Sequence, residues 1–212
     1  MISLASLHPD KHTAILDAAH KRFARYGLTK VTMDEIAEDL GMSKAALYYY
    51  FPTKEDLYRN VVASEQQDFA DRLEAIVRGS APAAKKLSGY FAEHLRLLGS
   101  LLDLRIIEAP AAYPVKPIMR DLFHEFSSTE TRFLEAIMRE GKKRREFAVE
   151  FPEKTARLVQ HVLQGLRMRF IKTMRDREQR EADIRAYRDE VLHFLKIFLM
   201  GISRQRNGVK TA

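Results

Sequence analysis

The stretch SKAALYYYFPTKEDLY, Ser43 to Tyr58, holds three tyrosines and a phenylalanine in one run between two lysines. Aromatic side chains usually lie in a core, so a run this dense indicates that some of them face outward. On a helical period the outward side holds a cation, a small residue and two phenols: Lys44, Ala45, Tyr48 and Tyr49. Such a side suits the major groove of DNA, where phenols and ammonium groups contact phosphates and base edges. The opposite side, with Leu47, Phe51 and most of Tyr50, is expected to be buried.

The residues before this run predict the element that positions it. In TMDEIAEDLG, Thr32 is a candidate N-cap and acidic residues follow in the first turn, where the helix dipole favours them. A helix-turn-helix requires a small residue where its helices meet, a turn residue that tolerates positive φ, and an apolar residue that packs the second helix onto the core. These roles fit Ala37, Gly41 and Leu47 in that order. The spacing alone leaves an ordinary helical hairpin open.

The remaining chain shows helical punctuation and no strand alternation. Gly27, Gly41, Gly79 and Gly141 are predicted helix ends, and Thr53 is a predicted start. The sequence therefore predicts an all-α fold, in which an N-terminal three-helix helix-turn-helix domain is joined by a long helix to a C-terminal helical bundle. The predicted boundaries are 1–55 for the DNA-binding domain and 56–212 for an effector-binding and dimerisation domain.

Charge locates no nucleic-acid site by itself. The 212 residues carry a net charge of +7, but residues 1–60 hold eight basic and eight acidic side chains. The excess lies in Gly141–Glu146, in Arg167–Arg180 and in the C-terminal tail, where it is compatible with solvated faces as well as with a nucleic-acid patch.

Composition also bounds the function. There is no cysteine, no apolar stretch approaching the roughly 20 residues of a membrane span and no secretory leader pattern, so we expect a cytoplasmic protein. Metalloprotease, P-loop and nucleophile-elbow motifs are missing. We therefore expect no catalytic residues, no metal and no cofactor.

The segment VTMDEIAEDLGMSKAALYYYFPTKEDLY resembles the N-terminal signature of the tetracycline-repressor (TetR) family of transcriptional regulators. The resemblance runs from Thr13 to about Tyr58, and Tyr50 stands where the family often has histidine. It implies DNA-binding roles for seven residues: Thr32, Ser43, Lys44, Ala45, Tyr48, Tyr49 and Lys54. Thr32 and Ser43 could also be simple helix caps, and Lys54 could be merely solvated.

The resemblance further implies a body that dimerises and binds a small-molecule effector. The last two helices are strongly apolar, which favours a homodimer seam, although a buried interior helix is the alternative; the seam residues are Val191, Leu195, Phe198 and Ile202. Candidate effector contacts, each of which could instead be ordinary core, are Phe91, His94, Tyr113, Phe126, Phe133, His161 and Gln164.

The function predicted from these features is a repressor that binds a near-palindromic double-stranded operator as a dimer and is released by an unidentified effector, with no membrane partner. The alternative is a helical adaptor whose basic helix, Arg167 to Arg180, binds a membrane surface or a partner.

Overall fold

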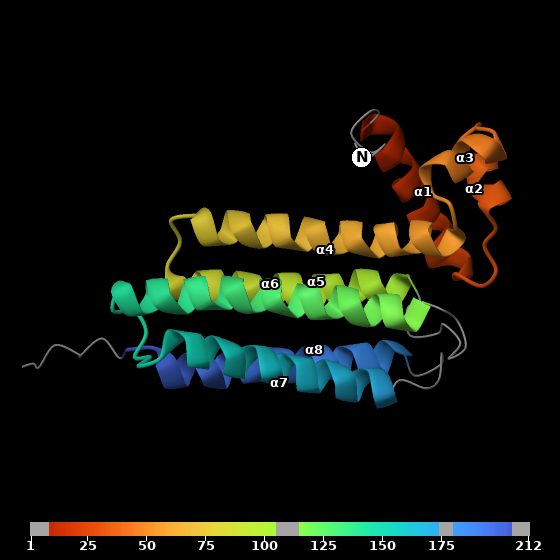
Figure 1. Cartoon of the computed structure of the whole chain (residues 1–212). Helices are drawn as coiled ribbons and strands as arrows, with labels where there is room; N and C mark the ends of the chain where they lie inside the picture. The colour runs from red at the N-terminus through yellow and green to blue at the C-terminus, as the bar shows by residue number, and fades with distance from the viewer. Residues whose placement is uncertain (1–8, 105–114, 174–179, 205–212) are drawn as a thin grey trace, which may run out of the picture. The chain divides into compact units, whose positions relative to one another are not determined.

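The computed structural model describes residues 9–104, 115–173 and 180–204. All the elements named in this part of the chain are helices (Figure 1), as the sequence predicts. Their bounds are α1 Pro9–Tyr26, α2 Met33–Asp39, α3 Lys44–Tyr50, α4 Lys54–Arg78, α5 Ala83–Asp103, α6 Val115–Lys143, α7 Pro152–Thr173 and α8 Arg180–Ile202. Among these helices, none combines the length and the apolar character of a membrane span.

The chain divides into two compact units. Unit 1 comprises Met1–Asp68 and Arg96–Glu125, and unit 2 comprises Phe69–Leu95 and Phe126–Ala212. The long helices α4, α5 and α6 each contribute residues to both units. The division falls inside α4, whereas the sequence places the functional boundary at residue 55, so that boundary stays a prediction.

Unit 1 is organised by side chains that α1 and α4 bury together. The ring of Phe23 meets the ring of Tyr58 edge-on at 5.1 Å, and both side chains are fully buried. The Tyr58 hydroxyl donates a 3.0 Å hydrogen bond to the carbonyl of Leu104, just beyond the end of α5. Burial raises the pKa of this phenol, which therefore remains a donor at physiological pH.

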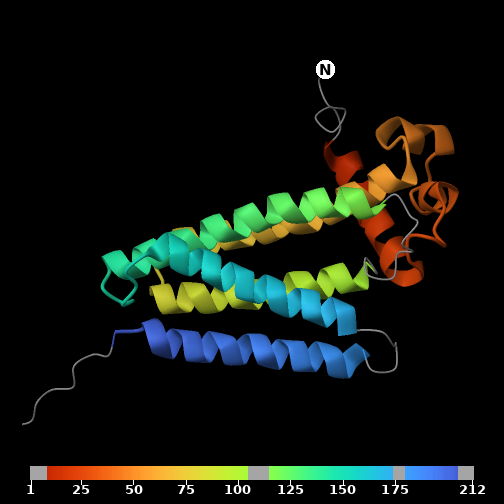
Figure 2. The same cartoon turned by 60° about the horizontal axis from the view of Figure 1, so that its bottom comes forward.

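Unit 2 has an aromatic core. Phe69 packs on Phe126 at 5.0 Å between ring centres, and Phe91 packs on Phe194 at 6.0 Å. Helices α7 and α8 contact each other and run antiparallel, as Figure 2 shows. Each buried ring removes a large apolar area from water, which is the main stabilising term for such a body.

The connection between α6 and α7 holds several helix ends in unit 2. The Glu146 carboxylate accepts a hydrogen bond from the backbone N–H of Ala83, where α5 begins, at 2.5 Å. The backbone N–H of Ala148 donates to the carbonyl of Ile202, at the end of α8. The side chain of Glu146 and the backbone of Ala148 therefore link the start of α5 and the end of α8 to one short segment.

Gly141 does not end α6, so the sequence-based prediction was wrong at this position. The helix continues to Lys143, and Arg145 adopts the left-handed conformation beyond it, with φ 58°. Gly141 has a different role, because a Cβ atom there would lie 2.2 Å from the ring of Phe147. The missing side chain makes room for that ring against α6.

Candidate nucleic-acid interface

The start of α2 is fixed by a capping box. The Thr32 side chain accepts a hydrogen bond from the backbone N–H of Glu35, and the Glu35 carboxylate accepts one from the backbone N–H of Thr32 at 2.8 Å. The backbone N–H and the hydroxyl of Thr32 both donate to the Glu35 carboxylate and hold its pKa below the ordinary value, so the carboxylate stays charged and the cap stays formed near neutral pH. The predicted N-cap is confirmed.

The turn between α2 and α3 depends on Gly41, whose φ is 59°. No side-chain crowding restricts this position, since a Cβ there would meet nothing within 4 Å; the backbone angle alone favours glycine. The backbone N–H of Met42 then donates to the carbonyl of Ala37 at 3.0 Å, which closes the turn. Ser43 caps α3 by accepting a hydrogen bond from the N–H of Ala46 at 3.2 Å.

The two sides of α3 differ as the sequence predicts. Leu47 and Phe51 are buried, and Tyr50 is half-buried. Tyr49 exposes 64% of its surface and Tyr48 exposes 39%, so both phenols are available to a partner. Ala45, one helical turn before them, is exposed and small, which allows a partner to approach the helix closely.

The two predicted DNA-contacting lysines have partners within the chain. The Lys44 ammonium lies 2.8 Å from the Asp34 carboxylate and 5.9 Å from the ring centre of Tyr48. The hydrogen bond from Lys44 to Asp34 raises the pKa of the lysine, and both groups are well exposed. Lys54 donates from its Nζ to the carbonyl of Val31 at 2.9 Å. A DNA contact by Lys44 would therefore compete with Asp34, and Lys54 also tethers the loop that precedes α2.

One positioning contact was missed from the sequence. Arg22 on α1 donates two hydrogen bonds to the Asp39 carboxylate at the end of α2, at 2.5 and 2.7 Å. These bonds hold the pKa of Asp39 below its ordinary value. Seventeen residues separate the partners, so no helical period links them in the sequence. The pair fixes α2 on α1 and thereby helps to place α3.

The basic segment of the adaptor hypothesis is not a continuous cationic face in the described residues. Arg167 is buried, with 8% of its surface exposed, and lies 3.9 Å from Glu130. Arg169 forms an ion pair with Glu190. Residues 174–179 of this segment lie outside the described residues.

The predicted effector contacts divide into three groups. Phe91, His94, Phe126 and Phe133 are buried in unit 2. His161 and Gln164 are exposed on α7, on the side that faces away from the core, and their role as effector contacts stays a prediction. Tyr113 lies outside the described residues.

A buried polar network surrounds His94. Its Nδ1 lies 3.0 Å from Glu130 and its Nε2 lies 3.1 Å from the Tyr187 hydroxyl, while the Tyr90 hydroxyl donates to Glu130 at 3.1 Å. Burial alone would raise the pKa of Glu130, but the hydrogen bond and charge of His94, with the charge of Arg167, hold it below its ordinary value. The sequence signals only His94 here, because the other members occupy positions that read as ordinary helix residues.

The predicted dimer seam is partly turned inward. Val191 and Leu195 are buried within the chain, and Phe198 and Ile202 are half-buried. The exposed apolar side chains of α7 and α8 are Leu158, Met168, Leu192, Ile197 and Met200, which we call the α7–α8 apolar face. A dimer interface on these two helices would therefore bury residues of the α7–α8 apolar face rather than Val191 and Leu195, which are already buried within the chain.

The fold and the geometry of α2 and α3 define a helix-turn-helix protein, and comparison with known proteins specifies its family. Residues 15–61 match the family described as bacterial regulatory proteins, tetR family. The crystal structure of a transcriptional regulator from Cytophaga hutchinsonii is similar over 92% of this chain and 99% of that chain, with 32% identity and a TM-score of 0.81. The chain belongs to the TetR family of transcriptional regulators.

Two further similarities are more distant. The fatty acid metabolism regulator protein of Bacillus subtilis is 26% identical over 131 residues, which are 62% of this chain and 68% of that protein. A SmeT–triclosan complex shares the fold, with 15% identity, a TM-score of 0.65 and 92% coverage of both chains. Several other curated regulators match over only 27% to 39% of their own length.

Replacing Leu47 by alanine tests the assignment of the two sides of α3. Leu47 is fully buried, so we expect Leu47→Ala to lower the free energy of unfolding by about 2–5 kcal/mol through a cavity in the core of unit 1. Tyr49→Ala is the matched control on the same helix and is expected to leave the melting temperature nearly unchanged. Equal destabilisation by both substitutions, measured by thermal denaturation, would show that the two sides have been confused.

Proposed function

We propose that this chain is a ligand-responsive repressor that binds a near-palindromic DNA operator as a homodimer and releases it when an effector binds. The observation that carries the proposal is the exposed side of α3, with Tyr48 and Tyr49 on a helix locked by Leu47. Residues 1–55 would read DNA, and residues 56–212 would dimerise and bind the effector. The proposal includes no catalytic step and no cofactor, and it places the protein in the cytoplasm with its DNA.

The chemistry of α3 supports DNA as the partner. Two phenols can donate to phosphates or pack on thymine methyl groups, and Lys44 can exchange Asp34 for a phosphate or a guanine edge. The capping hydroxyls of Thr32 and Ser43 are exposed and can bond a phosphate as well as the backbone. The small side chain of Ala45 allows DNA to approach the exposed side of α3 closely. The adaptor alternative gains no comparable support, because Arg167 is buried and Arg169 is paired within the chain.

The α7–α8 apolar face supports a homodimer. Met200 exposes 73% of its surface, Leu158 60% and Ile197 51%, and removing such side chains from water is worth about 25 cal/mol per Å². In a two-fold dimer the same face of each copy would meet the other. Two copies of α3 would then read half-sites one turn of DNA apart, about 34–36 Å.

The buried network around His94 supports an effector site in unit 2. Charged groups in an apolar body cost free energy unless they are paired, and they often mark functional positions. Phe91 and Phe126 would supply apolar contacts beside this network, and Glu130, Tyr90 and Tyr187 would supply hydrogen bonds. The name of the Bacillus subtilis relative makes fatty acids and their derivatives the first class to screen.

Selection of bound duplexes from a random pool tests DNA reading. We expect one enriched near-palindrome, and Lys44→Ala and Tyr49→Phe should each weaken binding to it by about tenfold at fixed salt. Lys85→Ala removes the same charge from an exposed position on α5 and is the matched control. No enrichment, or equal loss in the control, would contradict the assignment.

The dimer is tested by placing charge on the α7–α8 apolar face. Leu192→Glu combined with Ile197→Glu should convert the dimer to monomers, because two carboxylates would be buried at the seam. Ser88→Glu combined with Ala92→Glu adds the same charge to an exposed side of α5 as a control. Light scattering measures the mass. A wild-type chain that stays monomeric at high micromolar concentration would refute the dimer.

Calorimetry tests the effector proposal once a thermal-shift screen has found a ligand. Operator and effector should weaken each other by the same factor, about 5- to 150-fold, because coupling between two binding sites is reciprocal. Glu130→Gln keeps the shape of the network and removes its charge; it should change effector affinity while DNA affinity without effector stays constant. Glu181→Gln, at an exposed position on α8, is the matched control. Equal ligand affinity with and without DNA would exclude that ligand as the effector.

A further inference from the structure

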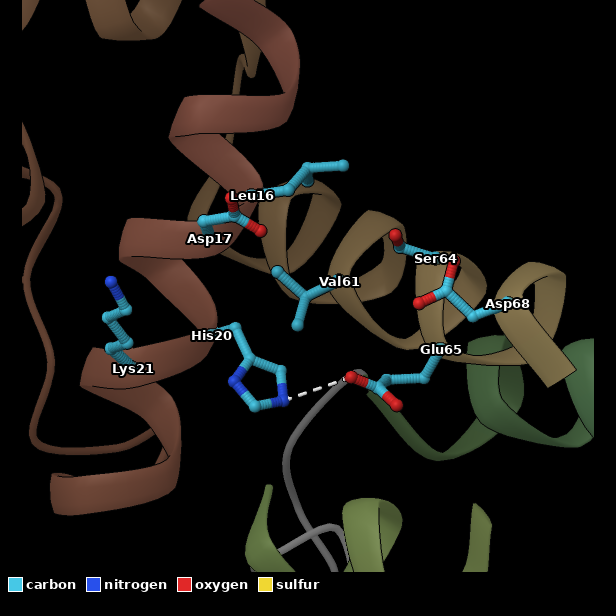
Figure 3. A pocket seen from close by; sticks show the side chains of 8 residues that line it. All are labelled: Leu16, Asp17, His20, Lys21, Val61, Ser64, Glu65 and Asp68. Carbon is cyan, nitrogen blue, oxygen red and sulfur yellow. Dashed lines mark ion pairs between the residues drawn. The ribbon is translucent and has the colours of Figure 1, made fainter. Parts of the chain in front are cut away.

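Helices α1 and α4 line a small, partly open cavity within unit 1 (Figure 3). Its volume is about 200 Å³, and side chains from both helices point toward it. Its polar lining consists of Asp17, His20 and Lys21 from α1 and Ser64, Glu65 and Asp68 from α4. None of these residues belongs to the proposed DNA-reading surface or to the network around His94.

One ion pair crosses this cavity from α1 to α4. The Nε2 atom of His20 lies 3.2 Å from a carboxylate oxygen of Glu65 (Figure 3). The two side chains are 33% and 17% exposed, so the pair is partly shielded from water. The Nε2 atom itself is cut off from water and has no hydrogen bond of regular geometry, which leaves the carboxylate as its polar neighbour. The attraction across the cavity therefore depends on whether the imidazole carries a proton.

The charges around His20 are mostly negative. The described groups that face it are Asp17 and Lys21 on its own helix, Glu65 and Asp68 on α4, and Asp103 at the end of α5. The short contact with the Glu65 carboxylate is the largest effect and raises the pKa of His20; burial opposes it, and the charges of Glu65, Asp103 and Asp17 add to the rise. This surrounding favours the imidazolium form.

The part of α1 around His20 also helps to position α3, the helix proposed to contact DNA. Arg22 lies two residues after His20 and holds the Asp39 carboxylate of α2. α2 leads through the Gly41 turn into α3. A contact that holds this part of α1 against α4 therefore also helps to hold α2, and through it α3, in place.

We propose that His20 and Glu65 form a proton-dependent latch between α1 and α4, which makes the stability of the helix-turn-helix unit, and its affinity for DNA, fall as the pH rises. The statement about DNA affinity rests on the proposed function. The statement about stability does not.

The sign follows from linkage. The pKa of His20 is higher in the folded chain than the value of about 6.5 in an unfolded chain. The stabilisation by the latch is therefore complete below pH ~6.5 and is lost as the pH rises through the higher folded value. Each unit of difference between the two pKa values corresponds to about a tenfold change in the folding equilibrium.

A second histidine in unit 1 acts in the opposite direction. Burial lowers the pKa of His12, whose ring lies 5.1 Å from that of Phe51. Its contribution favours the folded state as the pH rises through the unfolded value. The pH profile of the wild-type chain alone is thus a mixture, and the test must compare variants.

The first experiment measures protonation directly. In the full-length chain, an NMR titration of the histidine ring signals should give His20 a pKa above 6.5, and Glu65→Gln should lower it. A His20 value at or below 6.5, or one that Glu65→Gln leaves unchanged, would overturn the latch. This readout uses a variant that retains His20, so it stands even if substitution of His20 impairs folding.

The second experiment measures stability and DNA affinity between pH 5.5 and 9. His20→Gln should remove the fall in melting temperature above pH ~6.5, whereas the control His12→Gln should leave that fall in place, because the His12 contribution changes mainly below and around pH ~6.5. With the duplex selected from the random pool, wild-type affinity should drop more between pH 6 and pH 8.5 than that of His20→Gln, at constant ionic strength.

The outcomes separate the latch from the proposed function. Identical pH slopes of melting temperature in wild type and His20→Gln would overturn the latch. Identical pH dependence of DNA affinity in both chains would overturn its link to DNA reading. If no duplex is selected at all, the proposed function fails, while the titration and the melting curves still decide the latch.

Discussion

The burial of Leu47 is the constraint on which the exposed side of α3, the surface proposed to contact DNA, depends. A seven-residue helix has little stability of its own in water, so α3 persists because one side of it is packed. Once Leu47 and Phe51 occupy the core, the helical period leaves Tyr48 and Tyr49 outside. The Gly41 turn and the Arg22–Asp39 pair then set the angle at which this side is presented. Specific recognition thus begins with an apolar contact that never touches a partner.

Local rules account for what the sequence predicts well. Caps, turns and helix sides depend on residues within a few positions of one another, so Thr32, Ser43, Gly41 and the two sides of α3 could be assigned from spacing alone. The all-α fold follows from the same signals. Gly141 shows the limit of such rules: its signal is that of a helix end, but the ring of Phe147, six residues later, determines its role.

Contacts between distant segments account for what could not be predicted. Glu130 reaches His94 across 36 positions, and Arg22 reaches Asp39 across 17, with no periodic signature for either pair. The apolar pattern of α8 shows that the helix packs, but not which residues face the chain's own core. Val191 and Leu195 face inward while Leu192 and Ile197 stay exposed, a distinction that only the packing of α7 and α5 against α8 determines.

The short connection between α6 and α7 has a consequence for how this chain can vary in length. Glu146 bonds the first turn of α5, Phe147 fills the space beside Gly141, and Ala148 bonds the last turn of α8. Three successive residues are thus each committed to a different helix, and Arg145 before them is held in a conformation uncommon outside glycine. One added residue would displace all three contacts at once. Insertions and deletions in descendants of this sequence should therefore avoid this connection, and its length should change more slowly than its side chains.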